Sequence, residues 1–591
     1  MYRAPVEEIS FTLKNVAGLK EAIEAGVLGD LSEDLADAIL QEAGRFASEE
    51  VAPLRETGDR HGAVLKDAAV TTPPGWKELY KRWTEGGWNA LQAPEEFGGQ
   101  GLPAMLGVAT QEMWNSASMA FGIGPTLTMG AVEALDKHAS EELKRTYLEK
   151  LVSGEWMGTM NLTEPQAGSD LAALRTRAER AGDGTYRIFG QKIFITYGEH
   201  DFTDNIVHLV LGRLPDAPAG TRGISLFLVP KFLVSEDGSL GARNDVFCSG
   251  LEHKLGIHAS PTCTMIFGDG FAKDREPGAV GWLIGEENRG LACMFTMMNN
   301  ARLAVGIQGV AVAEAAFQKA LAYANERRQG KAADYEGEGM APIVHHPDVQ
   351  RNLLTMKALT QAARAICYSC AHATDRARAG GEGAQHWQER ANLLTPIAKA
   401  FSTDVGVDVA SLGVQVHGGM GFIEETGAAA LLRDARIAPI YEGTNGIQAI
   451  DLVTRKLPQS GGEHVHGYIA ELGEVVGRVR SSNLPGFGRA AEELDAALEN
   501  LSEATQHLQK ALGEGRMEEA LAGATPYLRL FGLAAGGAYL AQAALAGEDR
   551  ERQSLCRFFA ENLVGETRAL KQRVLEGAES LAAAGKSLIS A

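Results

Sequence analysis

The sequence predicts a mainly α-helical protein with a β domain in its middle. First, apolar residues recur at helical spacing over most of the chain. Second, this pattern stops between residues 158 and 286, where short β-type runs alternate with turn residues. Third, a chain of 591 residues, 45% of them hydrophobic, is long enough to bury the cores of several domains. The β-type runs lie at residues 185–189, 206–211, 224–229 and 263–267.

Taken in order, the pattern divides the chain into five parts. We expect an N-terminal arm, an N-terminal helical domain, a small and mostly antiparallel β-barrel or sandwich, a four-helix bundle with a loop inside it, and an extra C-terminal helical domain. Glycines and charges at residues 329–344 predict a solvated loop within the bundle. The five parts cover residues 1–36, 37–157, 158–286, 287–457 and 458–591.

The extra C-terminal region begins after a glycine-rich linker at residues 459–462. Leucines in this region recur at helical spacing and predict an apolar stripe that packs on the body or on a sister subunit. Glycines at residues 513 and 515 predict the end of that helix. The leucines are Leu494, Leu498, Leu501, Leu508 and Leu512.

The bulk composition excludes some classes of function. A net charge of −20 argues against binding to a nucleic-acid backbone, which basic surfaces drive. Six cysteines are too few for a disulfide framework in so long a chain, so a reducing, cytoplasmic setting is expected. The first residues lack the apolar core of a signal peptide. No run has the roughly 18 apolar residues of a membrane span.

Three local features invite other interpretations. The nearest candidate for a membrane contact, residues 531–546, is rich in Ala and Gly and predicts a buried helix, with contact to a membrane surface as the alternative. Cys367 and Cys370 lie in a helical pattern without a second pair, which favours core packing over a redox or metal site. His345 and His346 lack a matching carboxylate cluster, so no metal site is expected.

The most informative stretch runs Tyr441-Glu442-Gly443-Thr444-Asn445. An aromatic neighbour removes water from the Glu442 carboxylate, which raises its pKa and makes it a better base near neutral pH. Gly443 permits close backbone approach to a flat ligand. Thr444 and Asn445 add short polar groups. A surface turn is the alternative for this segment taken alone.

Four further motifs accompany this loop in a fixed order. They are Met160–Asp170 (MNLTEPQAGSD), residues 192–196 (KIFIT), residues 326–330 (ERRQG) and residues 415–421 (QVHGGMG). With the loop, they make residues 40–457 resemble the acyl-CoA dehydrogenase family. The resemblance implies FAD as cofactor and oxidation of an acyl-CoA thioester at its α and β carbons. No side chain accepts a hydride, so a cofactor is needed for such chemistry.

The resemblance also implies residue roles. Glu442 is expected to remove the α proton; some relatives carry the base just before Arg302, where this chain has Ala301. Family members often have Trp where Phe194 stands, so only the packing of the ring carries over. His417 is expected to pack inside its turn. Substrate contacts are expected at Ser169, Asn299, Arg302, Tyr441 and Gly443. Cofactor contacts are expected at Met160, Leu162, Thr163, Gly168, Ser169, Phe194, Ile195, Thr196, Arg327, Gln415, Gly418, Gly419, Thr444 and Asn445.

The N-terminal arm and the C-terminal helical region resemble the long bacterial branch of the family, whose members act on 3-methylmercaptopropionyl-CoA or on fatty acyl-CoA. The family's use of the residue 326–330 and 415–421 motifs at a neighbouring subunit's flavin implies an oligomer, and we expect a homodimer. Electrons are expected to pass to an electron-transferring flavoprotein. An oxidase that uses oxygen is the alternative, and a DNA-binding flavoprotein of the same fold is the remote one.

Overall fold

The computed structural model describes residues 1–273, 276–547 and 549–589, apart from the side chain of Asn299. The chain folds into two compact units that are interleaved in sequence. Unit 1 comprises Met1–Arg45, Pro103–Ser116 and Arg302–Ala591, as far as these are described. Unit 2 comprises Phe46–Leu102 and Ala117–Ala301.

Two long helices continue from one unit into the other. Helix α6 (Ala104–His138) is interrupted at Ser118, whose backbone is extended rather than helical. Helix α8 (Gly290–Glu326) passes from unit 2 into unit 1 between Ala301 and Arg302.

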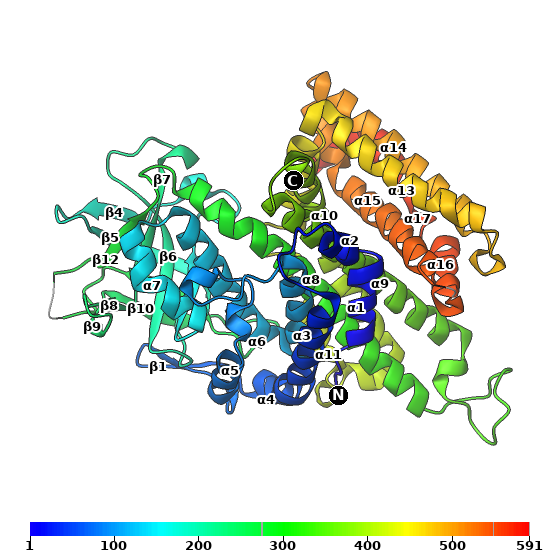
Figure 1. Ribbon diagram of the computed structural model, residues 1–591, viewed down its shortest axis with the longest axis horizontal. Helices are drawn as coiled ribbons and strands as arrows, with labels where there is room; N and C mark the ends of the chain where they lie inside the picture. Colours follow the sequence, from blue (N-terminus) through cyan, green and yellow to red (C-terminus); the bar gives the residue numbers. More distant parts are fainter. Residues whose placement is uncertain (274–275, 548, 590–591) are drawn as a thin grey trace. The chain divides into compact units, whose positions relative to one another are not determined.

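Unit 2 contains the β domain that the sequence predicts (Figure 1). Its larger sheet runs β10-β11-β5-β12-β7-β6-β3, and β4 pairs with both β5 and β6. The strands β5, β12, β7, β6 and β4 therefore close into a ring, which is the expected barrel. The pairs β3–β6 and β4–β6 are parallel and the others antiparallel. The strands are β3 (Trp156–Asn161), β4 (Arg177–Arg180), β5 (Tyr186–Thr196), β6 (Asn205–Arg213), β7 (Ile224–Pro230), β8 (Phe232–Val234), β9 (Leu240–Arg243), β10 (Val246–Leu251), β11 (Thr262–Phe267) and β12 (Ala279–Ile284).

Helices α4 (Arg55–His61), α5 (Trp76–Glu85) and α7 (Glu141–Ser153) complete unit 2 with the second half of α6. A hairpin of β1 (Val64–Lys66) and β2 (Ala69–Thr71) lies inside the region expected to be helical. The sequence missed it because each strand has three residues and the turn is Asp67-Ala68, not the usual Asn-Gly. Both turn residues have positive φ, as a two-residue hairpin turn of this kind requires.

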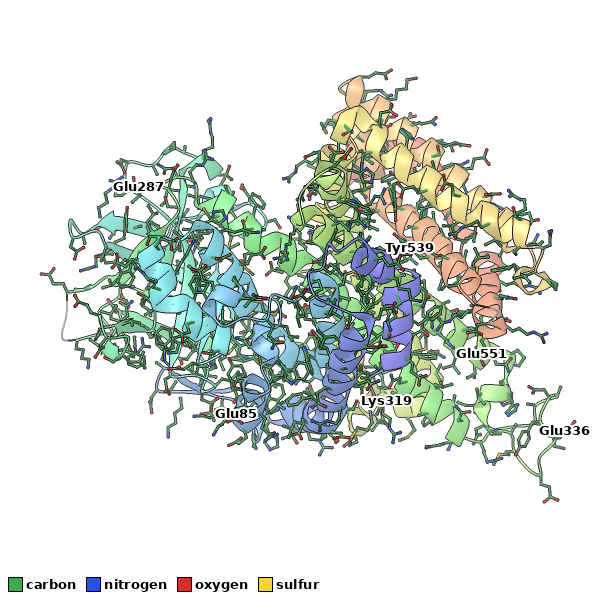
Figure 2. All side chains as sticks on the ribbon, in the orientation of Figure 1. Glu85, Glu287, Lys319, Glu336, Tyr539 and Glu551 are labelled. Atoms are coloured by element: carbon green, nitrogen blue, oxygen red, sulfur yellow. The ribbon has the colours of Figure 1, made fainter. Side chains whose placement is uncertain are left out.

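Unit 1 is built of helices around α8, α9 (Pro347–Arg378) and α10 (Ala384–His417). The N-terminal arm forms α1 (Val6–Asn15) and α2 (Leu19–Glu24), which pack on α9, and α3 (Glu33–Phe46) begins at its end. Residues 329–342 carry no helix, as predicted, and Figure 2 shows the loop around Glu336 extending away from the bundle. Helices α11 (Ala428–Ala435) and α12 (Asn445–Asp451) flank the Tyr-Glu-Gly loop.

The extra C-terminal helices are α13 (Glu463–Ser482), α14 (Ala490–Gly513), α15 (Met517–Leu545), α16 (Arg550–Asn562) and α17 (Glu566–Ile589) (Figure 1). In the described residues, α15 alone is long and apolar enough to cross a membrane, but 83% of its most apolar window is buried inside the protein. It packs on α9 and α10 through small residues: a Cβ at Gly532 would lie 2.2 Å from the Phe401 ring of α10, and one at Gly536 would lie 2.8 Å from Ala362 of α9. The predicted buried helix is confirmed.

Other fold predictions are also confirmed. The leucine stripe of α14 is buried at four of its five positions, with Leu512 at its partly exposed end, and the helix ends at Gly513. Cys367 and Cys370 are fully buried in α9 and donate to the backbone oxygens of Ala398 and Ala391. Burial raises the pKa of both thiols, that of Cys370 to about 12, so neither is a reactive thiolate at neutral pH.

Candidate active site

The loop between α11 and α12 is closed by backbone and side-chain hydrogen bonds. The Asn445 N–H donates to the Pro439 oxygen over 3.0 Å, and the Thr444 hydroxyl caps α12 by accepting from the Ile447 N–H. Gln448, which is fully buried on α12, donates its side-chain amide to the backbone oxygens of both Glu442 and Gly443, over 3.2 and 3.3 Å. The loop therefore has a fixed shape set by its own helix.

The backbone at the tip of this loop is left-handed. Glu442 has φ +55° and Gly443 has φ +83°. A non-glycine residue in this region is uncommon and costs free energy, so the surrounding hydrogen bonds must hold it there. At Gly443 a side chain would meet the Gln448 amide nitrogen at 2.7 Å. Position 443 therefore requires glycine, because of its left-handed backbone and because Gln448 leaves no room for a side chain.

The Glu442 carboxylate is half-buried, and its pKa is shifted from the ordinary value. Loss of water raises its pKa, and the charges of Lys399 and Arg302 partly oppose that rise. The sequence predicted a raised pKa from the Tyr441 ring. In the structure the Tyr441 hydroxyl is hydrogen-bonded to Gln308 of α8, and burial raises the pKa of this phenol too. A carboxyl group with a raised pKa suits general-base work near neutral pH.

A wholly buried lysine lies under the loop. Lys399 of α10 is 0% exposed and donates to the Asn445 side-chain oxygen over 2.9 Å. The Asn445 amide nitrogen in turn donates to Ala400, Thr403 and Asp404, the last over 2.7 Å. The Asn445 side chain is thus committed within the protein. It supports the loop, and the expected cofactor contact at Asn445 stays a prediction.

Arg302 is also buried, at 6% exposure, and pairs with Asp451 of α12 over 3.1 Å. The sequence left open an intrahelical salt bridge or a place in the acyl-CoA channel. The observed pair joins α8 to α12 and fixes the helix that follows Glu442. The side chain of Asn299, the other residue expected on this helix, lies outside the described residues.

In unit 2, the Leu162–Ser169 segment follows the buried strand β3 and lies beside β5. The Thr163 oxygen accepts from the Ile193 N–H over 2.9 Å, and the Thr159 hydroxyl donates to the Thr196 oxygen over 2.7 Å. Phe194 is 58% exposed and has φ +60°, so this strand presents an aromatic ring outward from a strained backbone. An exposed ring of this kind can stack on a flat ligand.

A buried ion pair supports this segment. Lys192, 0% exposed, donates to Glu164 over 2.8 Å and to the Leu162 oxygen over 2.9 Å. Burial opposes ionisation of Glu164, yet Lys192, Thr176 and the Arg175 N–H lower the pKa of Glu164 to about 2. Desolvation lowers the pKa of Lys192 to about 8, against the raising effect of Glu164. Both groups are therefore ionised at neutral pH.

The remaining predicted residues divide by exposure. The side chains of Met160 and Ile195 are buried in the cores of unit 2, and the expected cofactor contacts at these two positions stay predictions. Leu162, Thr163 and Thr196 are partly exposed, and Gly168 and Ser169 are exposed. Nothing described lies within 4 Å of a Cβ built at Gly168. The segment thus has open backbone beside partly exposed polar groups.

In unit 1, Arg327 and Gln415 are exposed near the ends of α8 and α10. Gly418 has φ +59°, and a Cβ at Gly418 or Gly419 would meet nothing described within 4 Å. These positions leave backbone open to a ligand. His417 is buried, stacks on Tyr323 with ring centres 4.5 Å apart, and bonds to the Gly413 oxygen. It packs as the sequence predicts.

Each unit, taken separately, has features that suit one part of a flavin nucleotide. Unit 2 offers an exposed ring at Phe194 and open backbone at Gly168. Unit 1 offers a cation at Arg327 and an uncovered glycine turn, which suit a pyrophosphate.

Comparison with known proteins agrees with this assignment. Four family models match the chain: acyl-CoA dehydrogenase N-terminal domain (residues 33–155), middle domain (159–269) and C-terminal domain (288–457), and an acetyl-CoA dehydrogenase C-terminal-like domain (466–584). The chain is 44% identical to 3-methylmercaptopropionyl-CoA dehydrogenase of Ruegeria pomeroyi over 98% of this chain and 99% of that one. It is 36% identical to a broad-specificity linear acyl-CoA dehydrogenase of Mycobacterium tuberculosis, covering 80% and 78%.

A solved structure supports the fold. Acyl-CoA dehydrogenase from Bacillus anthracis, complexed with FAD, superposes with a TM-score of 0.72 at 23% identity, covering 98% of this chain and 93% of that one. The chain belongs to the acyl-CoA dehydrogenase family. It is an FAD-dependent enzyme that removes hydrogen from the α and β carbons of acyl-CoA thioesters.

The sequence did not single out Lys399, Gln448 or Asp451. Gln448 and Asp451 lie on the same helical turns that follow Glu442, so helical spacing from the loop could have indicated them. Lys399 lies in an otherwise apolar helical run, and a charged residue at a core position was the available signal.

Proposed function

We propose that this dehydrogenase acts on 3-methylmercaptopropionyl-CoA or on fatty acyl-CoA of similar length, with Glu442 as the base. The identity of 44% to the Ruegeria pomeroyi enzyme over nearly the whole of both chains supports the first substrate. The linear acyl-CoA relative supports the second. The observation that carries the role of Glu442 is its raised pKa on a strained, hydrogen-bonded loop.

In this proposal, the Glu442 carboxylate takes the proton from the α carbon of the thioester. Bound FAD supplies the acceptor for the hydride that leaves the β carbon. The Glu442 N–H is proposed to donate to the thioester oxygen, where negative charge develops. Gln448 and Thr444 keep the loop in one shape, so the carboxylate does not have to be ordered during the reaction.

The cofactor-binding proposal rests on residues whose surroundings leave room for a ligand. Phe194 packs on the ring system, and Leu162, Thr163, Ser169 and Thr196 line its edge. Arg327 and the Gln415–Gly419 turn bind the pyrophosphate. Substrate contacts are proposed at Ser169, Tyr441 and Gly443. Arg302 acts through its pair with Asp451, which anchors α12.

The enzyme is proposed to work as a homodimer. Exposed apolar residues gather directly after the glycine turn: Met420 is 48%, Phe422 is 85% and Ile423 is 44% exposed. Apolar side chains at this density indicate a surface that another subunit covers. The family's use of this turn at a neighbouring flavin supports the same surface.

Electrons are proposed to pass to an electron-transferring flavoprotein, as in fatty acid β-oxidation. The alternative is an oxidase that passes them to oxygen. A cytoplasmic location is proposed from the six cysteines, all described, all buried and all unpaired in the described structure.

Anaerobic bleaching of the flavin by a panel of thioesters tests the function. We expect fast bleaching by 3-methylmercaptopropionyl-CoA and by short linear acyl-CoA such as butyryl-CoA, and slower bleaching by palmitoyl-CoA. Rapid peroxide release in air without another acceptor would favour the oxidase. Failure of every thioester to bleach the flavin would contradict the proposal.

A further inference from the structure

Lys399 is unusual among the charged residues of unit 1, because its whole side chain is buried. It lies on α10 in a run of buried residues and is 0% exposed. Its ammonium group can donate three hydrogen bonds, and in the described residues it donates one, to Asn445. Burying an ammonium group costs several kcal/mol in typical proteins, so packing alone would favour an apolar residue here.

The contact with Asn445 does not by itself require a charge. Asn445 is already held by the Ala400 oxygen, the Thr403 hydroxyl and the Asp404 carboxylate. Its own N–H is bonded to Pro439. A neutral donor at position 399 could complete this network, so the positive charge calls for a separate explanation.

The charge of Lys399 acts on Glu442, three residues before Asn445. Of the two cations that act on the Glu442 carboxylate, Lys399 has the larger influence and Arg302 the smaller. Arg302 is neutralised by its pair with Asp451, which also pairs with Arg455. Lys399 lies in no ion pair with a described carboxylate within 4.0 Å.

The other charged groups around these two residues act more weakly or elsewhere. Asp404 favours the charged form of Lys399, while Arg302 disfavours it. Arg529 of α15 acts on Asp404 rather than on Glu442. Lys456 interacts with Asp451, Arg302 and Arg455. Tyr441 interacts with Glu442 and with Asp434.

We propose that Lys399 is a positioning residue for the reaction: it tethers the catalytic loop through Asn445 and its charge keeps the half-buried Glu442 ionised in the resting enzyme. Burial alone favours a neutral carboxylic acid, which cannot accept a proton. The buried ammonium offsets that preference without touching the carboxylate. Desolvation lowers the pKa of Lys399 itself, and the charges of Glu442 and Asp404 oppose that decrease.

This inference rests on the proposed role of Glu442 and is tested on the FAD-loaded enzyme. The variants are Lys399→Met, which removes charge and tether, and Lys399→Gln, which removes the charge and keeps a hydrogen-bond donor. The pH profile of kcat/KM is measured with butyryl-CoA or 3-methylmercaptopropionyl-CoA, whichever reduces the flavin faster in the unmutated enzyme.

Both neutral variants should move the acid limb of the profile to higher pH. Below its midpoint we expect a loss of roughly tenfold or more in kcat/KM, the order expected when one neighbouring charge is removed. The activity of both variants should recover at higher pH. If the substitutions only unfolded the loop, raising the pH would not restore activity. Lys399→Arg, which keeps the charge, should move the limb back toward its original position.

A second readout does not depend on turnover. The infrared band of the protonated Glu442 carboxyl, assigned by its absence in Glu442→Gln, should persist to higher pH in Lys399→Gln than in the unmutated enzyme. Lys456→Met is the matched control, because Lys456 is a nearby lysine of unit 1 that acts on Arg302 and Asp451 but not directly on Glu442. Its profile and band should stay in place.

An unmoved acid limb and an unmoved band in Lys399→Met and Lys399→Gln would overturn the inference about Lys399. If instead Glu442→Gln retained full dehydrogenation, the proposed base itself would be wrong. The two failures are therefore distinguishable.

Discussion

At the scale of single residues, the Tyr441-Gly443 loop shows how a carboxylate is made into a base. Burial alone would leave Glu442 protonated, and full exposure would leave it too weak a base. The structure lies between these limits, because the side chain is half-buried and two cations act on it. The strained backbone at Glu442 is maintained by Gln448, which bonds to both oxygens of the turn.

Gly443→Ala should weaken this loop. The substitution places a side chain in a left-handed backbone, which costs about 1–2 kcal/mol, and drives a Cβ to 2.7 Å from the Gln448 amide. We expect kcat to fall while flavin binding is kept, measured by steady-state kinetics and flavin absorbance.

Gly446→Ala is the control for that substitution. Gly446 lies two residues inside the loop's own helix, has no positive φ, and its nearest neighbour is 3.8 Å from a built Cβ. Alanine should be tolerated there or slightly stabilising. Equal losses in the two variants would contradict a specific conformational role for Gly443.

The sequence predicted part of this residue-scale chemistry. A Tyr-Glu-Gly turn indicates a desolvated carboxylate, and the direction of the pKa shift is confirmed. The contributions of Lys399 and Arg302 could not be predicted, because their effect depends on which helices pack beneath the loop. For the same reason the sequence did not indicate the hydrogen bonds that the Asn445 side chain makes to α10.

At the scale of secondary-structure elements, the β domain combines an exposed segment after β3 with buried contacts that hold this segment. The segment after β3 is fixed by the Glu164–Lys192 pair and by backbone bonds to β5. Three of the four predicted β runs fall inside the observed strands β6, β7 and β11. The fourth, residues 185–189, begins one residue before β5, which continues seven residues beyond the end of that run. Strand ends depend on pairing partners, which the local pattern does not contain.

Lys192→Met should destabilise unit 2 strongly. It leaves the Glu164 carboxylate buried without its cation, which typically costs about 3–5 kcal/mol. Chemical denaturation followed by near-UV circular dichroism measures the loss. Lys150→Met, which breaks an exposed pair with Glu155, is the control and should cost under about 1 kcal/mol. Similar losses in both variants would show that the buried pair has no special importance.

The lowered pKa of Glu164 predicts how the free energy of unfolding depends on pH. Its pKa in the folded protein is about 2, below its ordinary value of 4.5, so the unfolded chain binds the proton more readily. Its stabilising contribution is therefore complete above pH 4.5 and decreases as the pH falls toward 2. The difference in unfolding free energy between the unmutated protein and Glu164→Gln should shrink over that range. A difference that stays constant as the pH falls would contradict the assignment.

At the scale of the whole molecule, contacts group segments that lie far apart in the sequence. Pro103–Ser116 and Met1–Arg45 belong to the same compact unit as the bundle. The buried pair of Glu112 with Arg364, at 2.6 Å, is one contact that joins these distant segments. Such long-range pairing leaves no periodic signal in the sequence.

The exposed apolar turn makes a prediction about assembly. Phe422→Ser should convert a dimer into a 63.0 kDa monomer, or shift the equilibrium toward it, because it removes the most exposed apolar side chain of the turn. Sedimentation velocity measures the mass. Val64→Ser, at a 58% exposed apolar residue of the β1–β2 hairpin, should leave the assembly unchanged. A dimer that survives Phe422→Ser at low concentration would place the interface elsewhere.

The central claim is that one carboxylate on the α11–α12 loop removes the α proton. Anaerobic stopped-flow reduction of the flavin in Glu442→Gln is the sharpest test of this role. An amide in place of the carboxylate keeps the shape of the side chain and removes the base. We expect this variant to keep normal flavin content and normal binding of acyl-CoA. Its rate of flavin reduction should be lower than that of the unmutated enzyme by about 10²–10⁴-fold or more. Reduction at a rate close to that of the unmutated enzyme would contradict it.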